Sequence, residues 1–367
     1  MRRLPNVLLC AALLAACGGD DAPDEPTAFD RWAEAQATGQ WRANGDEVVE
    51  VWVCRVPVDT TSAVYGDLPL RAPIAPATLA GLFQQQVSRY FHRISHTAYS
   101  PSFVAGGEIA LAAADGPEQC ASTALDRASD EADVVLAVAD AEHVEGEAGG
   151  MGSGGDPTAP DAAARATRRY AYVGAADFDR ATWGDTPPMD LVEHELGHAL
   201  GFVHSGVTDD QYLSALDLMS NSAAPRDTLP DRRDAPDVIA LHRVAAGWLT
   251  GDDVRRASAD GVSLTLQPST GDDGTRLLVL PVDATSFLTV ELLEPEGYDD
   301  HLPDAGIAVH LVTFDAARPL EAEVQPQLGE APFTDLLGPG DAATVAGWRI
   351  VVAPDGTVTA TPESPAS

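Results

Sequence analysis

Hydrophobic and polar positions follow two different patterns along the chain. Up to about residue 250, apolar runs typical of strands occur at 47–58, 103–113, 133–139 and 169–173, and the run 76–95 has the spacing of an amphipathic helix. From residue 251 onward, short β-type runs alternate with turn residues and no helical spacing is evident. The pattern therefore predicts an α+β protein whose C-terminal part is all-β, most simply a sandwich.

The same pattern suggests a division of the chain. We expect a first folded domain over residues 46–250 and a β-rich domain over residues 251–367. Residues 18–45 are predicted to be a flexible tether that includes a short helical segment at 28–41, because the stretch that opens it is rich in Gly, Asp and Pro. Within the first domain, the Gly/Pro/Asp-rich stretch 145–163 predicts a mobile loop.

The first 17 residues are typical of an export signal. A basic start is followed by an apolar run over 7–16, which is too short to span a bilayer. The run ends in Leu14-Ala15-Ala16-Cys17, which resembles a bacterial lipobox. That resemblance implies cleavage before Cys17, lipidation of its thiol, and anchoring to the cell envelope at a periplasmic or extracellular face. An ordinary signal peptide cleaved nearby is the alternative.

A candidate metal site stands near the middle of the chain, where residues 194–204 read H-E-x-x-H-x-x-G-x-x-H. His194 and His198 are one helical turn apart, so one helix face can present both imidazoles to a zinc ion. Gly201 can adopt the left-handed conformation that ends a helix and turns the chain. The turn would bring in His204 as a third ligand.

Glu195 has a different expected role. It is offset by one position from the row of histidines, so it can reach a zinc-bound water and act as its general base. Three protein ligands leave one coordination position open, as in catalytic rather than structural zinc sites. Surface histidines on an ordinary helix are the competing interpretation.

The eleven residues resemble the long zinc-binding motif of the metzincin metallopeptidases. That family has a methionine turn beneath the metal, and Asp217-Leu218-Met219-Ser220 follows at a suitable distance, with Met219 as the candidate. Some members carry a tyrosine two residues after this methionine; Asn221 stands there, so a tyrosine ligand of that kind is not expected. The segment 241–249 is similar to the end of the catalytic domain in immune inhibitor A-like and gametolysin-like peptidases. We expect His242, within it, to be structural.

The resemblance implies a metzincin-like catalytic domain and a zinc-dependent endopeptidase that acts on protein or peptide substrates. It also implies that the last strand before the zinc helix, over 169–173, borders the cleft and pairs with extended substrate. Two alternatives stay open: a catalytically inactive envelope protein that binds a partner, and a zinc hydrolase of a non-protein substrate. The first is disfavoured because Glu195 and all three histidines are present together.

Charge narrows the range of partners. The formal net charge is −35 and the chain contains no lysine, so nucleic acid and anionic lipid surfaces are disfavoured as partners. A solvated acidic surface is one interpretation and calcium binding is another. The candidate acidic clusters, Asp209-Asp210 and residues 294–304, match no defined calcium loop.

Cysteine usage fits export. Of four cysteines, Cys10 and Cys17 belong to the N-terminal apolar segment, which leaves Cys54 and Cys120 in the folded body. An even pair in an exported protein predicts one disulfide. Two separate buried thiols are the alternative, because no spacing rule defines a single pair.

Overall fold

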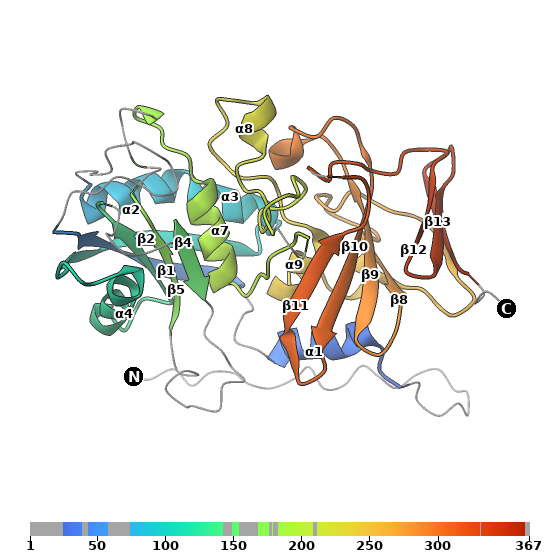
Figure 1. Cartoon of the computed structure of the whole chain (residues 1–367), viewed down its shortest axis with the longest axis horizontal. Helices are drawn as coiled ribbons and strands as arrows, with labels where there is room; N and C mark the ends of the chain where they lie inside the picture. The colour runs from blue at the N-terminus through green and yellow to red at the C-terminus, as the bar shows by residue number, and fades with distance from the viewer. Residues whose placement is uncertain are drawn as a thin grey trace.

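The computed structural model describes residues 25–38, 43–57, 74–141, 149–153, 168–175, 178, 183–207, 211–330 and 332–363. Within these ranges the strands form three sheets, and the chain has mixed helical and sheet structure, consistent with the predicted α+β class (Figure 1). No helix in the described ranges combines the length and the apolar character needed to cross a bilayer. The predicted signal peptide and Cys17 lie outside these ranges.

The first sheet contains β1 (Gly45–Arg55), β2 (Tyr99–Ala110), β3 (Val134–Ala139), β4 (Gly150–Ser153) and β5 (Arg169–Val173). Their order in the sheet is β2-β1-β3-β5-β4. Strands β2, β1, β3 and β5 run parallel to one another, whereas β4 is antiparallel to β5 and lies at the edge.

Strand β4 corrects two expectations. It lies in the stretch 145–163, where glycine content predicts a mobile loop; pairing with β5 makes residues 150–153 a strand instead, and most of the remaining stretch lies outside the described ranges. Strand β5, which is expected to border the cleft, is internal to the sheet between β3 and β4. The edge strand before the zinc helix is therefore β4.

Helices cover both faces of this sheet because alternate side chains of β1 enter different cores. Val51 and Val53 pack with three helices on one face, whereas Cys54 packs with one helix on the other face. The helix predicted over 76–95 is divided in two at Gln86. The three helices of the first face are α2 (Pro76–Gln85), α3 (Val87–Ile94) and α7 (Asp190–Ala199), and the single helix of the second face is α4 (Pro117–Arg127).

A disulfide joins this sheet to α4. Cys54 in β1 and Cys120 in α4 are bonded, with their Cα atoms 5.9 Å apart. The bond is the predicted one, and both residues are fully buried. Such a bond is typical of an oxidising, exported environment.

The strands after residue 250 form two further sheets, with orders β11-β10-β9-β8-β6 and β12-β13-β14-β7. Leu278 and Val290 of the larger sheet share one core with Ile350 and Val358 of the smaller sheet, so the two sheets pack face to face. The strands are β6 (Val254–Arg256), β7 (Val262–Thr265), β8 (Leu277–Pro281), β9 (Ser286–Leu293), β10 (Gly306–Asp315), β11 (Arg318–Pro326), β12 (Ala342–Val345), β13 (Trp348–Val352) and β14 (Thr357–Pro362).

Helix α1 (Ala28–Thr38) packs on the larger of these sheets, although it precedes β1 in the chain (Figure 1). Phe29 and Trp32 lie with ring centroids 5.4 and 5.9 Å from that of Phe287 in β9. Part of the predicted tether over 18–45 is therefore a packed helix. The remaining short helices are α8 (Pro225–Thr228), α9 (Ala240–Ala246), η2 (Gly251–Asp253) and η3 (Gly297–Asp299).

Candidate metal centre

Three histidines converge at the end of α7. The helix presents His194 and His198, and Gly201, with a φ of +84°, turns the chain in the left-handed conformation predicted for it. The turn brings His204 back, so that its Nε2 atom lies 3.3 Å from Nε2 of His194 and 3.0 Å from Nε2 of His198. Ligands of a tetrahedral zinc ion with Zn–N bonds of about 2.0–2.1 Å are about 3.3–3.4 Å apart, so the observed spacing fits one metal ion.

The other ring nitrogens orient two of the imidazoles. Nδ1 of His194 lies 2.9 Å from the carbonyl oxygen of Leu218, and Nδ1 of His198 lies 2.9 Å from that of Phe202. Since a carbonyl oxygen only accepts, each Nδ1 carries the hydrogen and donates it. Each Nε2 lone pair is therefore free to face the metal, as in other histidine metal sites.

Burial keeps these histidines neutral. It lowers the pKa of His194 to about 4 and that of His198 to about 3, and the neighbouring imidazoles lower the pKa of His198 further. Burial also lowers the pKa of His204. Metal binding requires neutral imidazoles, so the site needs no deprotonation at neutral pH.

Glu195 lies beside the cluster but is not part of it, since the convergent set contains only the three histidines. Its carboxyl is buried, and its Oε2 atom makes no hydrogen bond to a described residue. Burial raises the pKa of Glu195 to about 8. A buried carboxyl oxygen without a protein partner is costly unless a water, metal or substrate group satisfies it.

Two glycines of β4 allow that strand to pack against Glu195. A Cβ atom at Gly150 would overlap the Glu195 carboxyl, and one at Gly152 would overlap the Glu195 carbonyl oxygen and approach His198 Cβ to 2.8 Å. The alternate glycines therefore allow an edge strand to run directly beside the proposed base.

We expect Gly152→Ala to lower catalytic activity by at least about tenfold and stability by about 1–3 kcal/mol, because α7 or β4 must shift. Gly81→Ala is the matched control: Gly81 lies in α2 with no atom within 4 Å of an added Cβ, so the change should leave activity intact. Hydrolysis rates and thermal unfolding of both variants measure this. Full activity in Gly152→Ala would show that the contact between β4 and α7 is not needed to hold Glu195.

Met219 lies beneath α7. It is fully buried, and its Sδ atom is close enough to Gly197 that an added Cβ there would lie 2.6 Å away. The backbone of the same turn reaches two ligand segments: Leu218 accepts from His194, and the Met219 carbonyl accepts from the N–H of Ser205 at 3.1 Å. Met219 thus packs against the helix that carries His194 and His198.

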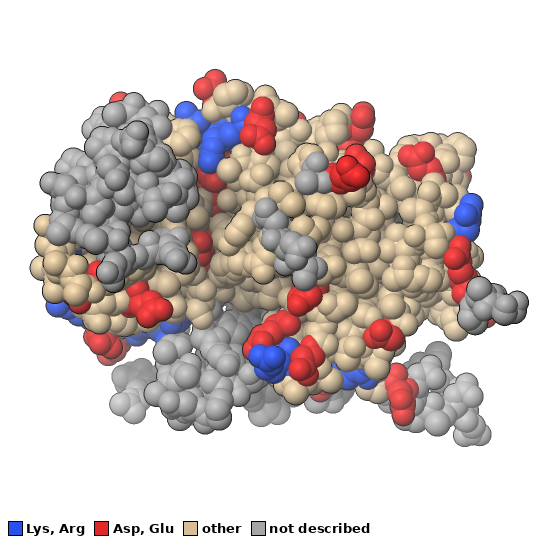
Figure 2. All heavy atoms as spheres, in the orientation of Figure 1, with Lys and Arg blue, Asp and Glu red and all other residues tan. Residues whose placement is uncertain are grey.

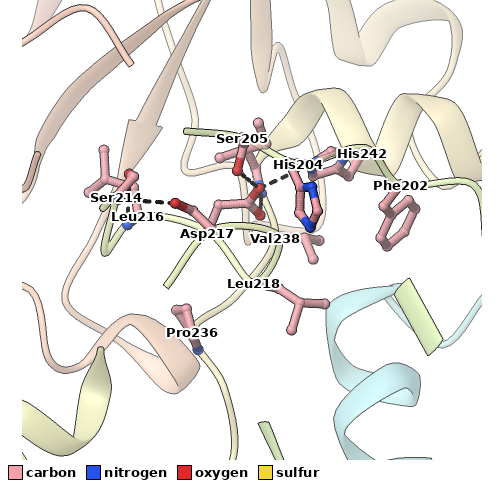
Figure 3. Close-up of polar contacts among 12 residues, drawn as sticks. Phe202, His204, Ser205, Ser214, Leu216, Asp217, Leu218, Pro236, Val238 and His242 are labelled. Atoms are coloured by element: carbon pink, nitrogen blue, oxygen red, sulfur yellow. Dashed lines mark hydrogen bonds and ion pairs between the residues drawn. The ribbon is translucent and has the colours of Figure 1, made fainter. Parts of the chain in front are cut away.

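A buried carboxylate joins the methionine turn to the third ligand. Ser205 Oγ and His242 Nε2 both donate to Oδ2 of Asp217, the latter at 2.9 Å, and the N–H of Ile239 donates to Oδ1 at 3.1 Å (Figure 3). Burial alone would raise the pKa of Asp217, but His242 and these hydrogen bonds lower it below its ordinary value. His242 is therefore occupied as a structural residue, as the sequence predicts. The roles of Ser205 and Asp217 were missed.

Tyr212 also reaches the histidines. Its ring centroid lies 5.2 Å from that of His204 and 6.1 Å from that of His194, and its hydroxyl lies 3.4 Å from His204 Nε2. The side chain is 54% exposed, so it stands at the open side of the cluster. Asn221, the position considered in the sequence, supplies no tyrosine, and Tyr212 arrives from the loop between the third histidine and the methionine. No local pattern in the sequence indicates that Tyr212 lies beside the histidines.

The described residues contain no candidate calcium site formed by converging acidic side chains. Among the described ranges, no other set of three His, Cys, Asp or Glu side chains converges as the histidines do, and the acidic stretch 294–304 forms no such set. Asp209 and Asp210 lie outside the described ranges.

Comparison with known proteins does not assign the chain to a family. The chain matches no protein-family model and no curated protein. The assignment of a possible metal-dependent hydrolase therefore rests on the geometry of the three histidines and on Glu195 beside them.

Proposed function

We propose that the chain is a zinc-dependent endopeptidase of the metzincin type. The observation that carries this proposal is the convergence of three Nε2 atoms, from His194, His198 and His204, at ligand spacing beside the buried carboxyl of Glu195. The turn at Gly201 and the methionine beneath the helix support the same family.

Zinc is the metal that this donor set favours. Three neutral imidazoles suit zinc, whereas calcium and magnesium prefer oxygen ligands. When bound, a zinc ion would supply the Lewis acidity that activates water and polarises a substrate carbonyl. The buried Oε2 of Glu195 has no partner among the described residues, so a water molecule or substrate group would have to satisfy it.

Within this proposal the protein's own residues have distinct tasks. Glu195 takes a proton from the attacking water and later gives it to the leaving nitrogen of the peptide bond. Burial raises the pKa of Glu195 to about 8, and the positive charge of a bound zinc ion would lower it, so that the carboxylate form can take the proton. The outer edge of β4, which pairs with no strand among the described residues, is the edge along which extended substrate would lie.

The proposal is tested by incubating the purified protein, without its first 17 residues, with an unfolded protein substrate in the presence and absence of a zinc chelator. We expect fragments only without chelator, and recovery of cleavage when zinc is restored. Cleavage that persists after the metal is removed would contradict a zinc peptidase.

We also propose that the chain is exported and anchored to the cell envelope through Cys17. The disulfide supports export, and the lipobox-like end of the apolar run supports lipidation. Cys17→Ser should move the protein from the membrane fraction to the soluble fraction, or block its processing. Cell fractionation and mass spectrometry of the mature N-terminus measure this; wild-type protein with an unmodified N-terminus beyond residue 17 would rule out the anchor.

A further inference from the structure

A groove of about 460 Å³ begins at the metal ligands and extends to the sheet of the C-terminal part of the chain. One wall comes from α7 and the loop that follows it, and the other comes from β11. On the first wall are His198, Phe202, Val203, His204, Val207 and Gln211; on the second are the residues from Glu321 to Gln325.

Strand β11 is held in place on one face and along its outer edge. Ala322 and Val324 enter the core beneath α1, so Glu321 and Glu323 lie on the opposite face of the strand. Ser205, the residue after the third ligand, forms a parallel bridge with Val324. The wall of the groove is therefore tied by the backbone to the segment that carries a metal ligand.

The charged side chains on the β11 wall of this groove are acidic. Among the described residues, its lining includes two glutamates and no arginine, and the chain has no lysine. Glu321 pairs with Arg318 at 2.6 Å, but both side chains are more than half exposed, so the pair is weak and open to exchange. Glu323 makes no ion pair with a described residue. Figure 2 shows acidic side chains, with basic ones among them, at the lower end of β11 on this face.

We propose that the groove is a substrate subsite for an arginine or lysine side chain, and that Glu321 and Glu323 determine this specificity. The proposal rests on the peptidase function proposed above. A basic side chain combines an apolar stem with a cationic head, and the groove offers Val203 and Val207 beside the ligands and carboxylates on the facing strand. The C-terminal sheet is therefore part of the substrate site and not only a brace.

The test uses pairs of fluorogenic peptides that differ at one position near the scissile bond, where one member has arginine and the other its neutral isostere citrulline. At the position whose side chain enters the groove, the wild type should cleave the arginine peptide with a kcat/KM at least about fivefold higher than that for the citrulline peptide. The preference should weaken as salt is raised. The double variant E321Q/E323Q should lose it, with the two peptides cleaved within about twofold of each other.

The matched control is E118Q/E131Q, which removes two exposed acids away from the groove and should keep the preference. Fluorescence anisotropy can measure the binding of the same peptides to zinc-loaded Glu195→Gln. This second readout does not depend on turnover. Equal cleavage of arginine and citrulline peptides by the wild type at every position, or an unchanged preference in E321Q/E323Q, overturns the subsite while leaving the peptidase. A zinc-loaded wild type that cleaves no peptide overturns the peptidase function and the subsite with it.

Discussion

Replacing Glu195 with glutamine is expected to remove nearly all hydrolytic activity while zinc stays bound. Glutamine keeps the size of the side chain but cannot take a proton from water, and general-base catalysis contributes about a hundredfold to ten-thousandfold. The three histidines converge without Glu195, so metal content should stay near one zinc per chain. Peptide hydrolysis and elemental analysis of the same sample measure the two effects.

A matched control lies on the same helix. Glu193 is also fully buried; its Oε2 accepts from the N–H of Ala235 at 2.8 Å, and its Oε1, like Oε2 of Glu195, has no partner among the described residues. Burial raises the pKa of Glu193 well above its ordinary value. Glutamine keeps the size of this side chain and an oxygen that can accept from Ala235. Glu193→Gln should therefore keep activity within a few-fold of the wild type. If both variants were equally active, Glu195 would not be the base.

Replacing His204 with alanine has the second large expected effect, on metal binding itself. His204 Nε2 lies within 3.3 Å of both other Nε2 atoms, so its removal leaves only two of the three converging imidazoles. We expect zinc affinity to fall by at least about a hundredfold and activity to fall with it. Zinc retained after dialysis, measured beside the rate of peptide hydrolysis, records both losses.

His92→Ala controls for the loss of a histidine. His92 lies exposed on α3, where its Nδ1 contacts Ser100 Oγ at 3.0 Å, and it takes no part in the convergent set. This variant should keep zinc and activity. Full zinc and full activity in His204→Ala would instead show that the third ligand lies elsewhere. The extended motif would then not describe the metal site.

The convergence of the three histidines could be predicted because local rules define it. A separation of four residues places His194 and His198 on one helix face, and the left-handed turn at Gly201 needs no knowledge of the remaining fold. The disulfide could be predicted by counting the cysteines outside the predicted export signal. The histidines lie within a few residues of one another, and each of the two remaining cysteines has only the other as a partner.

Other parts of the site depend on contacts that no local pattern records. Strand β4 has no apolar alternation; it is a strand because β5 pairs with it, and its glycines follow from the close approach of Glu195. Tyr212 joins the histidines only because the loop after His204 folds over them. The acidic wall of β11 comes from a strand more than a hundred residues after the zinc helix.

Helix α1 shows the same limit at the level of the fold. Its own sequence permits a short helix, but its partner, Phe287, stands about 250 residues further along the chain. The short helix predicted over 28–41 is therefore present, but its packing on the C-terminal sheet could not be predicted from its own sequence.

The central claim, that three histidines hold one catalytic zinc ion, is tested most directly by a zinc titration. The protein is stripped with a chelator, zinc is returned in sub-stoichiometric steps, and bound zinc and peptide hydrolysis are measured at each step. We predict that the rate rises in proportion to bound zinc and stops rising at about one zinc per chain. A rate that is unaffected by stripping, or a folded protein that binds no zinc, would contradict the claim.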